Sequence, residues 1–399
     1  MIAVLHIVGD TKFGGACRII LRLAAMARSE GQVVDILATD PVFQTEIRKV
    51  GFGLVSRDWI RREIRPVFDT WGLYRLYRFL ATHPYDVVHT HTSKGGFLGR
   101  VAARLAGVPI IIHTAHGFAI HESSPLSHRL AYTFLERIAG ACCDRIVCVS
   151  QFHRGWALRL GMAAEGKLLA IPNGIETDRV AASRSAAETR AQLGVGAHEW
   201  FVLSHGRLAP QKGLEDLIHA VHYIAPSTRL PLRVVLAGEG PLRPSLEKLV
   251  AGLGLEQSVV FAGFREDIGN LLAACDVVVL PSLREGLSIS LLEAMAAGRP
   301  IVATSIGSNR ELCSAPEAAL LVPPRSPQLL ASAVRRCLTD QALAAELAAN
   351  ARRIFQQRYT EARMVETYRL LYRQLLAKLA PLRTTRLAGA SLQHPDHAL

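Results

Sequence analysis

Short apolar runs alternate with amphipathic segments along the first half of the chain. Continuous runs rich in Val, Ile and Leu predict strands that are buried on both faces. They occupy residues 2–8, 33–38, 85–89, 108–113, 145–150 and 168–171. Between the first two runs, apolar side chains recur at helical spacing over residues 16–28. This order of strand, helix and strand predicts the start of a doubly wound parallel sheet.

The same alternation restarts in the second half. Strands are predicted at residues 200–205, 232–237, 259–262, 276–280 and 301–304, and helices at 214–223, 329–337, 343–355 and 364–379. The stretch 176–198 lacks strand character and marks a domain boundary. We therefore expect an α/β protein with two Rossmann-like domains, 1–175 and 176–358, that face a cleft. A last helix at about 360–380 should pack back on the first domain, and the polar tail 383–399 should be disordered.

Length and cysteine usage agree with this organisation. The chain has 399 residues, enough for two domains with ample cores. Its seven cysteines are scattered without a CxxC pair, which favours a reducing cytosol over a disulfide framework. The first eight residues are typical of a strand rather than a signal peptide, and no apolar run approaches the roughly 18 residues of a membrane helix. We expect a soluble protein on the cytoplasmic side.

Positive charge suggests an anionic partner. The formal net charge of +12 suits lipid head groups, nucleic acid or phosphorylated substrates and does not choose among them. Residues 57–68 mix basic and apolar side chains: Arg57, Arg61, Arg62 and Arg65 alternate with Trp59, Ile60, Ile64, Val67 and Phe68. Such a mixture indicates a segment at a membrane interface. An ordinary amphipathic helix with a charged outer face is the alternative, favoured for residues 71–81.

Histidines stand at the ends of two predicted strands. His89 and His91 could suggest a metal, but no third ligand stands at a usual spacing, so hydrogen-bonded residues at a strand end are the simpler interpretation. His116 follows the strand 108–113, and Gly117 leaves room beside it. Open α/β sheets bind ligands at the carboxyl ends of their strands, so His116 is a candidate ligand contact.

The segment Glu285–Glu293 has the features of a phosphate site. A buried strand ends at Pro281-Ser282, and a helix follows. The N–H groups of Leu287, Ser288 and Ile289 are therefore expected to be free donors at a helix start, which attracts phosphate. Glu285, before Gly286, and Glu293, within the helix, could accept hydrogen bonds from sugar hydroxyls. The alternative is a surface helix with two solvated glutamates.

Three glycine-bounded loops add to this picture. Arg207 and Lys212 lie between Gly206 and Gly213, after a predicted strand, and a bidentate guanidinium with a point charge is a good pair for a diphosphate. The turn Gly238-Glu239-Gly240-Pro241 is compatible with phosphate. In the first half, Gly14-Gly15 would allow close approach of a ligand, although a plain tight turn is equally consistent with it.

Taken in order, these motifs resemble one family. The chain is similar to GT-B-fold retaining glycosyltransferases of family 4. The matching pieces are Gly14-Gly15, Thr114-Ala115-His116-Gly117, Pro172-Asn173-Gly174, Gly206-Arg207 with Lys212-Gly213, Gly238-Glu239-Gly240-Pro241, and Glu285 with Glu293. They span residues 1 to about 380. Residues 90–118 look most like bacterial enzymes that extend undecaprenyl-diphosphate-linked glycans.

The resemblance implies roles for these residues. The second domain would bind a nucleotide-diphospho-sugar, with a UDP-sugar as the expected donor, and the first domain would bind a lipid-linked glycan acceptor. Arg207 and Lys212 would hold the diphosphate, Glu293 the ribose and Glu285 the sugar. His116 would contact the sugar from the first domain and Gly15 would approach the phosphate. The base would lie against Phe264-Arg265. Ser288 departs from the family, in which many members carry Gly or Pro.

The expected chemistry needs no metal. The sequence contains no Asp-x-Asp, so cationic side chains and helix-start amides would stabilise the leaving nucleoside diphosphate. No convincing nucleophile is present, which favours same-face displacement assisted by the leaving phosphate.

Two alternative functions are a nucleotide-sugar epimerase of the same fold and a basic nucleic-acid-binding protein, and the sequence lacks the signature of any nucleic-acid-binding module. We expect no cofactor, no nucleic acid partner, and peripheral contact with the inner face of the plasma membrane, in surface polysaccharide synthesis.

Overall fold

The computed structural model divides the chain into two compact units. It describes residues 1–9, 11–61, 63–120, 124–224, 231–314, 317–377 and 379. Unit 1 comprises Met1–Val149, Arg154–Ile171 and the chain from Met364, whereas unit 2 comprises Ser150–His153 and Pro172–Arg363. The units divide between Ile171 and Pro172, four residues before the boundary predicted from the sequence.

Unit 1 is built on a seven-stranded sheet in the order β3-β2-β1-β4-β5-β6-β7, and every pairing is parallel. The strands are β1 (Ala3–Gly9), β2 (Val33–Ala38), β3 (Gly53–Val55), β4 (Val87–His91), β5 (Ile110–Ala115), β6 (Arg145–Cys148) and β7 (Leu168–Ala170). The helices are α1 (Gly15–Ser29), α2 (Pro41–Val50), α3 (Pro66–Thr82), α4 (Ser93–Leu105), α5 (Leu126–Ala141) and α6 (Gln151–Arg159), with a 3-10 turn η1 (Glu165–Lys167).

Unit 2 repeats the arrangement with six parallel strands in the order β10-β9-β8-β11-β12-β13. The strands are β8 (Trp200–His205), β9 (Leu232–Ala237), β10 (Val259–Gly263), β11 (Val277–Leu280), β12 (Ile301–Thr304) and β13 (Leu320–Val322). The helices are α7 (Ala186–Gln192), α8 (Leu214–Ile224), α9 (Arg243–Gly252), α10 (Ile268–Ala274), α11 (Ile289–Ala296), α12 (Gly307–Cys313), α13 (Pro327–Thr339) and α14 (Gln341–Arg358), with 3-10 turns η2 (Thr177–Val180) and η3 (Pro210–Lys212).

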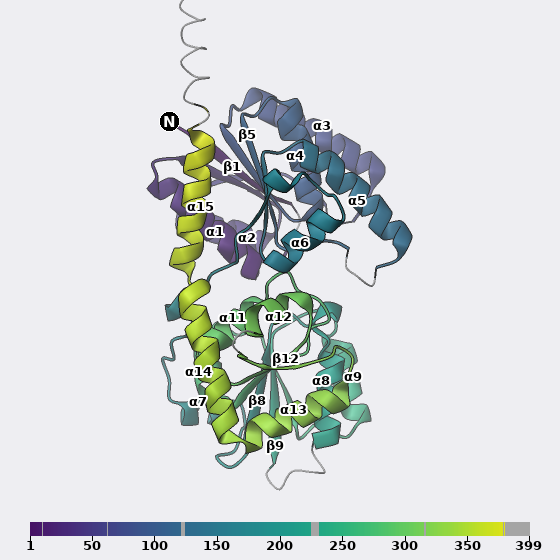
Figure 1. Cartoon of the computed structure of the whole chain (residues 1–399), viewed down its shortest axis with the longest axis vertical. Coiled ribbons are helices and arrows are strands. Elements are labelled where there is room, and N and C mark those ends of the chain that lie inside the picture. The colour runs from purple at the N-terminus through teal and green to yellow at the C-terminus, as the bar shows by residue number, and fades with distance from the viewer. Residues whose placement is uncertain are drawn as a thin grey trace, which may run out of the picture. The chain divides into compact units, whose positions relative to one another are not determined.

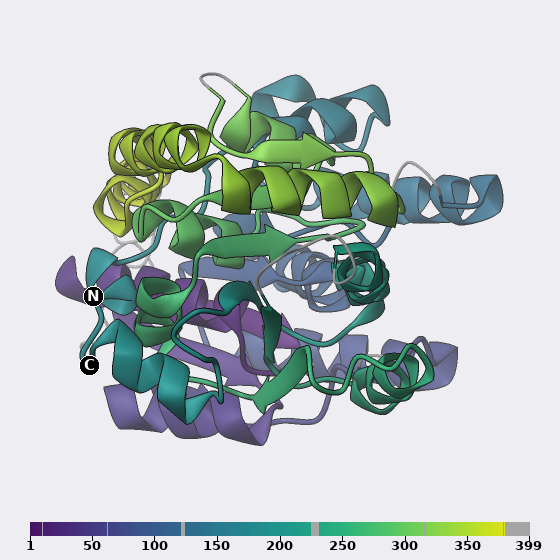
Figure 2. The ribbon, with the colours of Figure 1, turned by 90° about the horizontal axis from the view of Figure 1, so that it is seen from below.

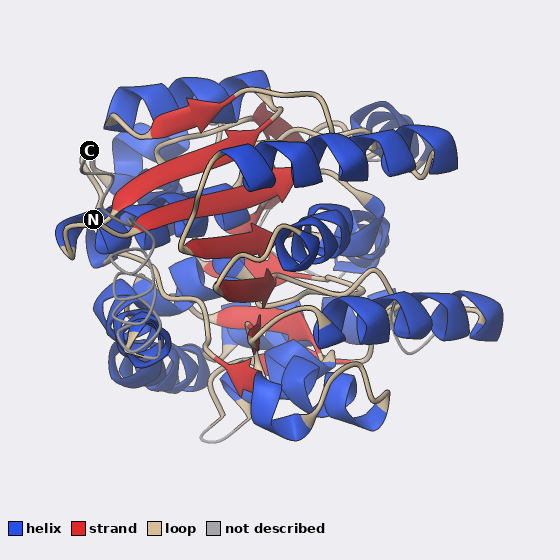
Figure 3. Ribbon diagram, turned by 90° about the horizontal axis from the view of Figure 1, so that it is seen from above, coloured by secondary structure: helices blue, strands red, loops and turns tan. Residues whose placement is uncertain are grey.

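Helices cover both faces of each sheet, as Figure 3 shows. In unit 2, α13 packs along β12 and β13 (Figure 2). Parallel strands covered on both faces must be apolar throughout, and β11 is accordingly buried at all four positions. The prediction of two doubly wound parallel-sheet domains is confirmed.

The last helix, α15 (Glu361–Leu376; Figure 1), belongs to unit 1 from Met364 onward. Two buried tyrosines anchor it there. The hydroxyl of Tyr372 lies 2.8 Å from His89 Nδ1, and that of Tyr368 lies 3.0 Å from Thr114 Oγ1. At the surface, Arg373 pairs with Glu30 at 2.9 Å. Buried hydrogen bonds of this kind fix the register of the helix on the sheet, because a shifted helix would leave polar atoms unpaired.

Some elements differ from the sequence predictions. The stretch 176–198 contains α7, whose Ser185 and Glu188 form a capping box that sequence reasoning overlooked. The short edge strands β3 and β13 and the helix α5 were also not predicted. All seven cysteines are free, as expected. The tail 383–399 lies outside the described residues.

The basic segment 57–68 does not present its apolar side chains as predicted. Ile60 is only 1% exposed and belongs to the core of unit 1, and Trp59 packs against that core. Arg61 pairs with Asp58 at 2.6 Å, and Arg62 lies outside the described residues. The expectation that Ile60 enters a membrane interface is therefore wrong, because core packing buries it, and Trp59 is half-buried against the same core. The exposed apolar residues here are Ile64 and Val67.

Among the helices in the described ranges, none combines the length and the apolar character needed to cross a membrane.

Candidate functional site

Loops at the carboxyl ends of β8 and β11 meet in unit 2. The backbone N–H of Leu283, after β11, donates to the carbonyl of Gln211, after β8, at 2.8 Å. Gly213 has a φ of 59°, and a Cβ there would overlap the carbonyl oxygen of Pro281. Glycine is therefore required at this position for two reasons, the left-handed backbone and the close approach of the two loops.

The turn after β9 packs against the same loop. The N–H of Leu208 donates to the carbonyl of Glu239 at 3.0 Å, and a Cβ on Gly240 would overlap the Leu208 backbone. Loop packing thus explains why residue 240 is a glycine.

A hollow at this edge of the sheet is lined by Ser204, His205, Gly206, Arg207, Leu208, Lys212, Leu214, Leu280, Pro281 and Ser282.

Lys212 and Glu285 form an ion pair beside this hollow. Lys212 Nζ lies 2.6 Å from Glu285 Oε1, and the two side chains are 15% and 14% exposed. The hydroxyl of Ser282 also donates to Glu285 Oε1, at 2.9 Å. The sequence placed these two residues in one site with separate roles, and the structure brings them into direct contact.

Glu293 is buried in the first turns of α11 and has two partners. Its Oε2 lies 2.9 Å from His205 Nε2, and Arg179 donates to Oε1. Burial raises the pKa of Glu293, but the hydrogen bonds and charges of His205 and Arg179 outweigh burial and hold the pKa below its ordinary value. Glu293 is therefore a charged, oriented acceptor. The alternative of a solvated surface glutamate is wrong at this position, because only 2% of the residue is exposed.

Sequence reasoning did not identify His205 or Arg179 as part of this site. His205 ends β8, and its position directly before Gly206 and Arg207 was a usable signal. Arg179 lies in η2, in a stretch interpreted only as a domain boundary, and nothing in the sequence connects it with Glu293 across more than a hundred residues.

The start of α11 differs in detail from the prediction. The helix begins at Ile289, and Ser288 is its N-cap, with the hydroxyl accepting from Leu291 N at 3.4 Å. Ser288 thus stabilises the helix start. Of the three predicted helix-start donors, Ile289 is the first residue of the helix and Ser288 is its cap, whereas Leu287 is buried and lies before the cap.

The remaining predicted residues of unit 2 lie on neighbouring loops. Arg207 lines the hollow next to Lys212. Phe264, after β10, is 62% exposed. The guanidinium of Arg265 donates two hydrogen bonds to the carboxylate of Asp267, of 2.8 and 2.7 Å. Phe264 thus offers an open aromatic surface, while the Arg265 guanidinium is held by its neighbour.

In unit 1, the predicted residues also follow strand ends. Gly14 is the extended N-cap of α1, and Gly15 is the first residue of that helix, after β1. His116 follows β5. Burial lowers the pKa of His116 to about 4, so its ring is neutral at physiological pH. The structure places Gly14, Gly15 and His116 at the carboxyl edge of the unit 1 sheet.

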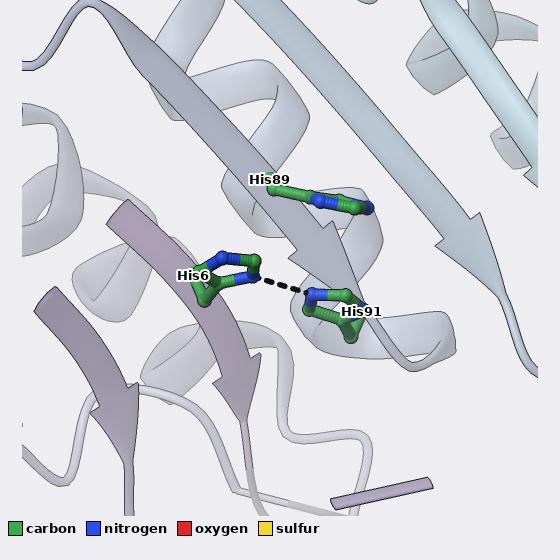
Figure 4. Close-up of side chains that lie close together, drawn as sticks. All are labelled: His6, His89 and His91. Carbon is green, nitrogen blue, oxygen red and sulfur yellow. Dashed lines mark hydrogen bonds between the residues drawn. The ribbon is translucent and has the colours of Figure 1, made fainter. Parts of the chain in front are cut away.

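His89 and His91 have a third histidine beside them. His6 of β1 is paired in register with His89 of β4, and its Nδ1 lies 3.0 Å from His91 Nε2 (Figure 4). His89 is hydrogen-bonded on both ring nitrogens, to Tyr372 and to Thr114 at 2.8 Å each. The structure agrees with the interpretation of these histidines as hydrogen-bonded residues at a strand end.

The chemistry of the unit 2 site is that of anion and hydroxyl recognition. Arg207 and Lys212 supply positive charge at a glycine-lined edge, and two oriented carboxylates, Glu285 and Glu293, supply acceptors. Cations next to oriented carboxylates suit a ligand that carries phosphate and several hydroxyl groups.

The same fold occurs in other solved structures. Anabaena HepE, in a crystal structure with UDP and glucose, gives a TM-score of 0.80 at 23% identity and covers 94% of this chain and 100% of HepE. WaaG, a glycosyltransferase involved in lipopolysaccharide biosynthesis, gives 0.74 at 20% identity, over 92% of this chain and 98% of WaaG. The architecture is therefore the GT-B fold of two Rossmann-like domains.

Sequence similarity identifies the family. The model for Glycosyltransferase Family 4 matches residues 13–179, and the model for Glycosyl transferases group 1 matches residues 185–354. The putative glycosyltransferase EpsD of Bacillus subtilis is 30% identical over 317 residues, which are 77% of this chain and 82% of EpsD. The chain belongs to the family 4, group 1 glycosyltransferases.

A further relative has a defined reaction in its name. The UDP-Gal:alpha-D-GlcNAc-diphosphoundecaprenol alpha-1,3-galactosyltransferase of Escherichia coli is 36% identical over 251 residues. The match covers 62% of this chain and 65% of that enzyme. The two relatives and WaaG are named as glycosyltransferases, and none of them supports the epimerase alternative.

The partners of Glu293 generate a stability prediction. His205→Ala should lower the free energy of unfolding by about 3 kcal/mol, because a buried carboxylate oxygen loses its hydrogen-bond donor. The measurement is the midpoint shift in urea unfolding. His222→Ala, at an exposed position of α8, is the control and should change stability by less than about 0.5 kcal/mol. Equal stability of the two variants would contradict the structural role of His205.

Proposed function

We propose that this protein is a retaining glycosyltransferase that moves a sugar from a UDP-sugar to a lipid-linked glycan acceptor during bacterial surface polysaccharide synthesis. The observation that carries the proposal is the pairing of Lys212 with Glu285 beside Arg207 at the carboxyl edge of the unit 2 sheet. A diphosphate can replace the carboxylate as the partner of Lys212, and Glu285 then becomes available to sugar hydroxyls.

The donor is bound by unit 2 in this proposal. Arg207 and Lys212 hold the diphosphate, and Glu293, oriented by His205 and Arg179, accepts from the ribose hydroxyls. The base lies against the exposed Phe264 and its neighbour Arg265. From unit 1, Gly15 approaches the phosphate and His116 contacts the sugar. Support for uridine comes from HepE, whose structure holds UDP, and from the E. coli relative, whose name gives UDP-Gal as donor.

The acceptor is a glycan on a lipid diphosphate at the cytoplasmic face of the membrane. The E. coli relative is named for GlcNAc-diphosphoundecaprenol, and WaaG is described as involved in lipopolysaccharide biosynthesis. In the transfer step the bond between the anomeric carbon and the leaving phosphate breaks, and the acceptor oxygen attacks from the same face. Its proton passes to the departing phosphate oxygen. Arg207 and Lys212 stabilise the charge that develops on the leaving group.

The diphosphate site generates the test of the function. Arg207→Ala and Lys212→Ala should each lower turnover by roughly 10²–10³, the scale for losing a preorganised charged donor. The assay follows transfer of labelled sugar from UDP-sugars to an undecaprenyl-diphosphate-linked GlcNAc acceptor. Lys248→Ala, which removes an exposed charge of α9, is the matched control and should leave turnover unchanged. Turnover within a few-fold of wild type in a folded Arg207→Ala/Lys212→Ala double variant would refute the assignment.

Metal independence is a second expectation of the proposal. The sequence has no Asp-x-Asp, and side-chain cations stand where a metal would otherwise neutralise the diphosphate. Turnover should therefore persist in EDTA at close to its full rate. Complete loss in EDTA that magnesium or manganese restores would show that the diphosphate is neutralised by a metal.

Peripheral membrane contact is also proposed, with a revised surface. Helices α3, α4 and α5 lie side by side in one layer of unit 1 (Figure 1). Along α5, four apolar residues at every fourth position are exposed: Leu126, Leu130, Phe134 and Ile138. The basic segment 57–68, with its exposed Ile64 and Val67, includes the first residues of α3. Apolar side chains and basic residues together suit an anionic bilayer surface.

This surface predicts salt-sensitive binding to vesicles that contain anionic lipid. Each basic residue contributes about 1 kcal/mol near such a surface, so changing Arg57, Arg61, Arg62 and Arg65 to Gln should abolish most of the binding. Leu130→Gln with Phe134→Gln should also weaken it, because apolar area no longer enters the interface. Leu329→Gln, at an exposed position of α13, is the control. Sedimentation of both variants with vesicles at the wild-type level would exclude this surface as the anchor.

A further inference from the structure

Three histidines of unit 1 form a continuous hydrogen-bonded series that ends at His116. His6 Nδ1 lies 3.0 Å from His91 Nε2, and His91 Nδ1 lies 3.2 Å from His116 Nε2. His6 belongs to β1, His91 ends β4 and His116 follows β5. Both ring nitrogens of His91 are therefore committed to histidine partners on neighbouring strands.

The two ends of the series differ in their surroundings. His6 is fully buried, and its Nε2 has no hydrogen-bond partner within the described ranges. His116 Nδ1 is likewise a buried atom without a partner in the described ranges, although His116 follows a strand end and the residue as a whole is partly exposed. The first end is closed by the core, whereas the second is at the edge of the sheet where ligands bind.

Burial keeps the three hydrogen-bonded histidines uncharged. It lowers the pKa of His6 to about 3 and that of His116 to about 4, and it lowers the pKa of His91 as well. Each neutral ring carries one proton, so each ring has one donor and one acceptor nitrogen. Because His91 uses both nitrogens, both hydrogen bonds must run in the same direction. All three rings then carry the proton on Nδ1, or all three carry it on Nε2.

The closed end favours one of these two states. With every proton on Nε2, an N–H of His6 would point into the core without an acceptor. With every proton on Nδ1, the unpaired atom at that end is a lone pair, and the N–H appears at His116. An unpartnered buried donor is tolerated less well than an unpartnered acceptor. Each state leaves one such donor, because His116 Nδ1 is a buried atom as His6 Nε2 is. The core encloses the donor of His6, whereas His116 is a partly exposed residue at the edge of the sheet where ligands bind, so an oxygen atom of a ligand is an available partner only in the all-Nδ1 state.

The geometry of the three histidines His6, His89 and His91 fits hydrogen bonding better than it fits a bound metal ion. His6, His89 and His91 place ring nitrogens within 4.8 Å of one another. The rings of His89 and His91 are stacked, with centroids 4.4 Å apart, so they do not point at a common centre. Both nitrogens of His89 already have partners in Tyr372 and Thr114. The 3.0 Å between His6 and His91 is a hydrogen-bond distance.

We propose that His6 and His91 are positioning residues that fix the tautomer of His116, so that His116 presents its Nδ1–H as a donor to an oxygen atom of the transferred sugar. This inference rests on the proposed function for the identity of the ligand. The tautomer itself is a property of the free protein, and it can be tested whether or not the protein transfers sugar.

The first test uses wild-type protein without substrate. Two-dimensional ¹⁵N correlation spectra of the imidazole rings report which nitrogen carries the proton. We expect His6, His91 and His116 to be neutral and protonated on Nδ1. A different tautomer in any one of the three, or a shift pattern typical of bound zinc, would overturn the proposal without any variant being made.

The second test uses two substitutions of similar burial. In His6→Asn, the amide N–H replaces the Nδ1 donor to His91, so His91 and His116 should remain protonated on Nδ1. In His6→Leu this donor is lost, and His116 should become a mixture of tautomers. His222→Gln, at an exposed position of unit 2, is the control for removal of one histidine and should leave the other rings unchanged.

Kinetics connect the tautomer with sugar transfer. His6→Leu should lower kcat/KM by roughly tenfold, the scale for one misdirected hydrogen bond, and His6→Asn should restore most of it. Equal loss in both variants, with the His116 tautomer unchanged, would mean that His6 has only a packing role. If neither the wild type nor any variant transfers sugar although all three rings are protonated on Nδ1, the proposed function is refuted. The assignment of the tautomers would still stand.

Discussion

Every functional loop of this protein depends on the parallel arrangement of its strands. Parallel pairing brings the carboxyl ends of neighbouring strands to one edge of a sheet, and the connections leaving that edge must share the space. In unit 2, the loops after β8 and β11 approach so closely that Gly213 cannot carry a side chain. That approach brings Lys212 within 2.6 Å of Glu285, although 72 residues separate them in the chain.

The second constraint is that buried polar groups need partners. Glu293 is held by His205 and Arg179, and His89 by Tyr372 and Thr114. In each case the partner comes from a distant part of the chain, so the hydrogen bonds fix both side-chain orientation and tertiary packing. The same groups that make the sites rigid also join α15 to the sheet of unit 1 and η2 to α11 of unit 2.

This explains what the sequence could and could not predict. Strands such as β11 were identified because a strand buried on both faces is a continuous apolar run. The glycine loops and Glu285 were identified through their position after such strands. The helix α7 was overlooked because its short sequence has little apolar periodicity, although Ser185 and Glu188 mark its start. His6 and Arg179 could not be connected with their partners, because the pairing depends on sheet order and loop packing. Ile60 was misassigned because an apolar residue among arginines has the same local pattern in a core and at a membrane.

The ion pair between Lys212 and Glu285 couples two parts of the donor under the proposed function. Without donor, each group neutralises the other in a site where both are mostly buried. When a diphosphate takes Lys212, Glu285 keeps the hydroxyl of Ser282 as its remaining hydrogen-bond donor among the described residues. A buried carboxylate with so few donors is costly, and the hydroxyl groups of a bound sugar supply those it lacks. After transfer the sugar has left, and the carboxylate again competes with the nucleoside diphosphate for Lys212. One ion pair therefore favours the intact donor and assists release of the spent nucleotide.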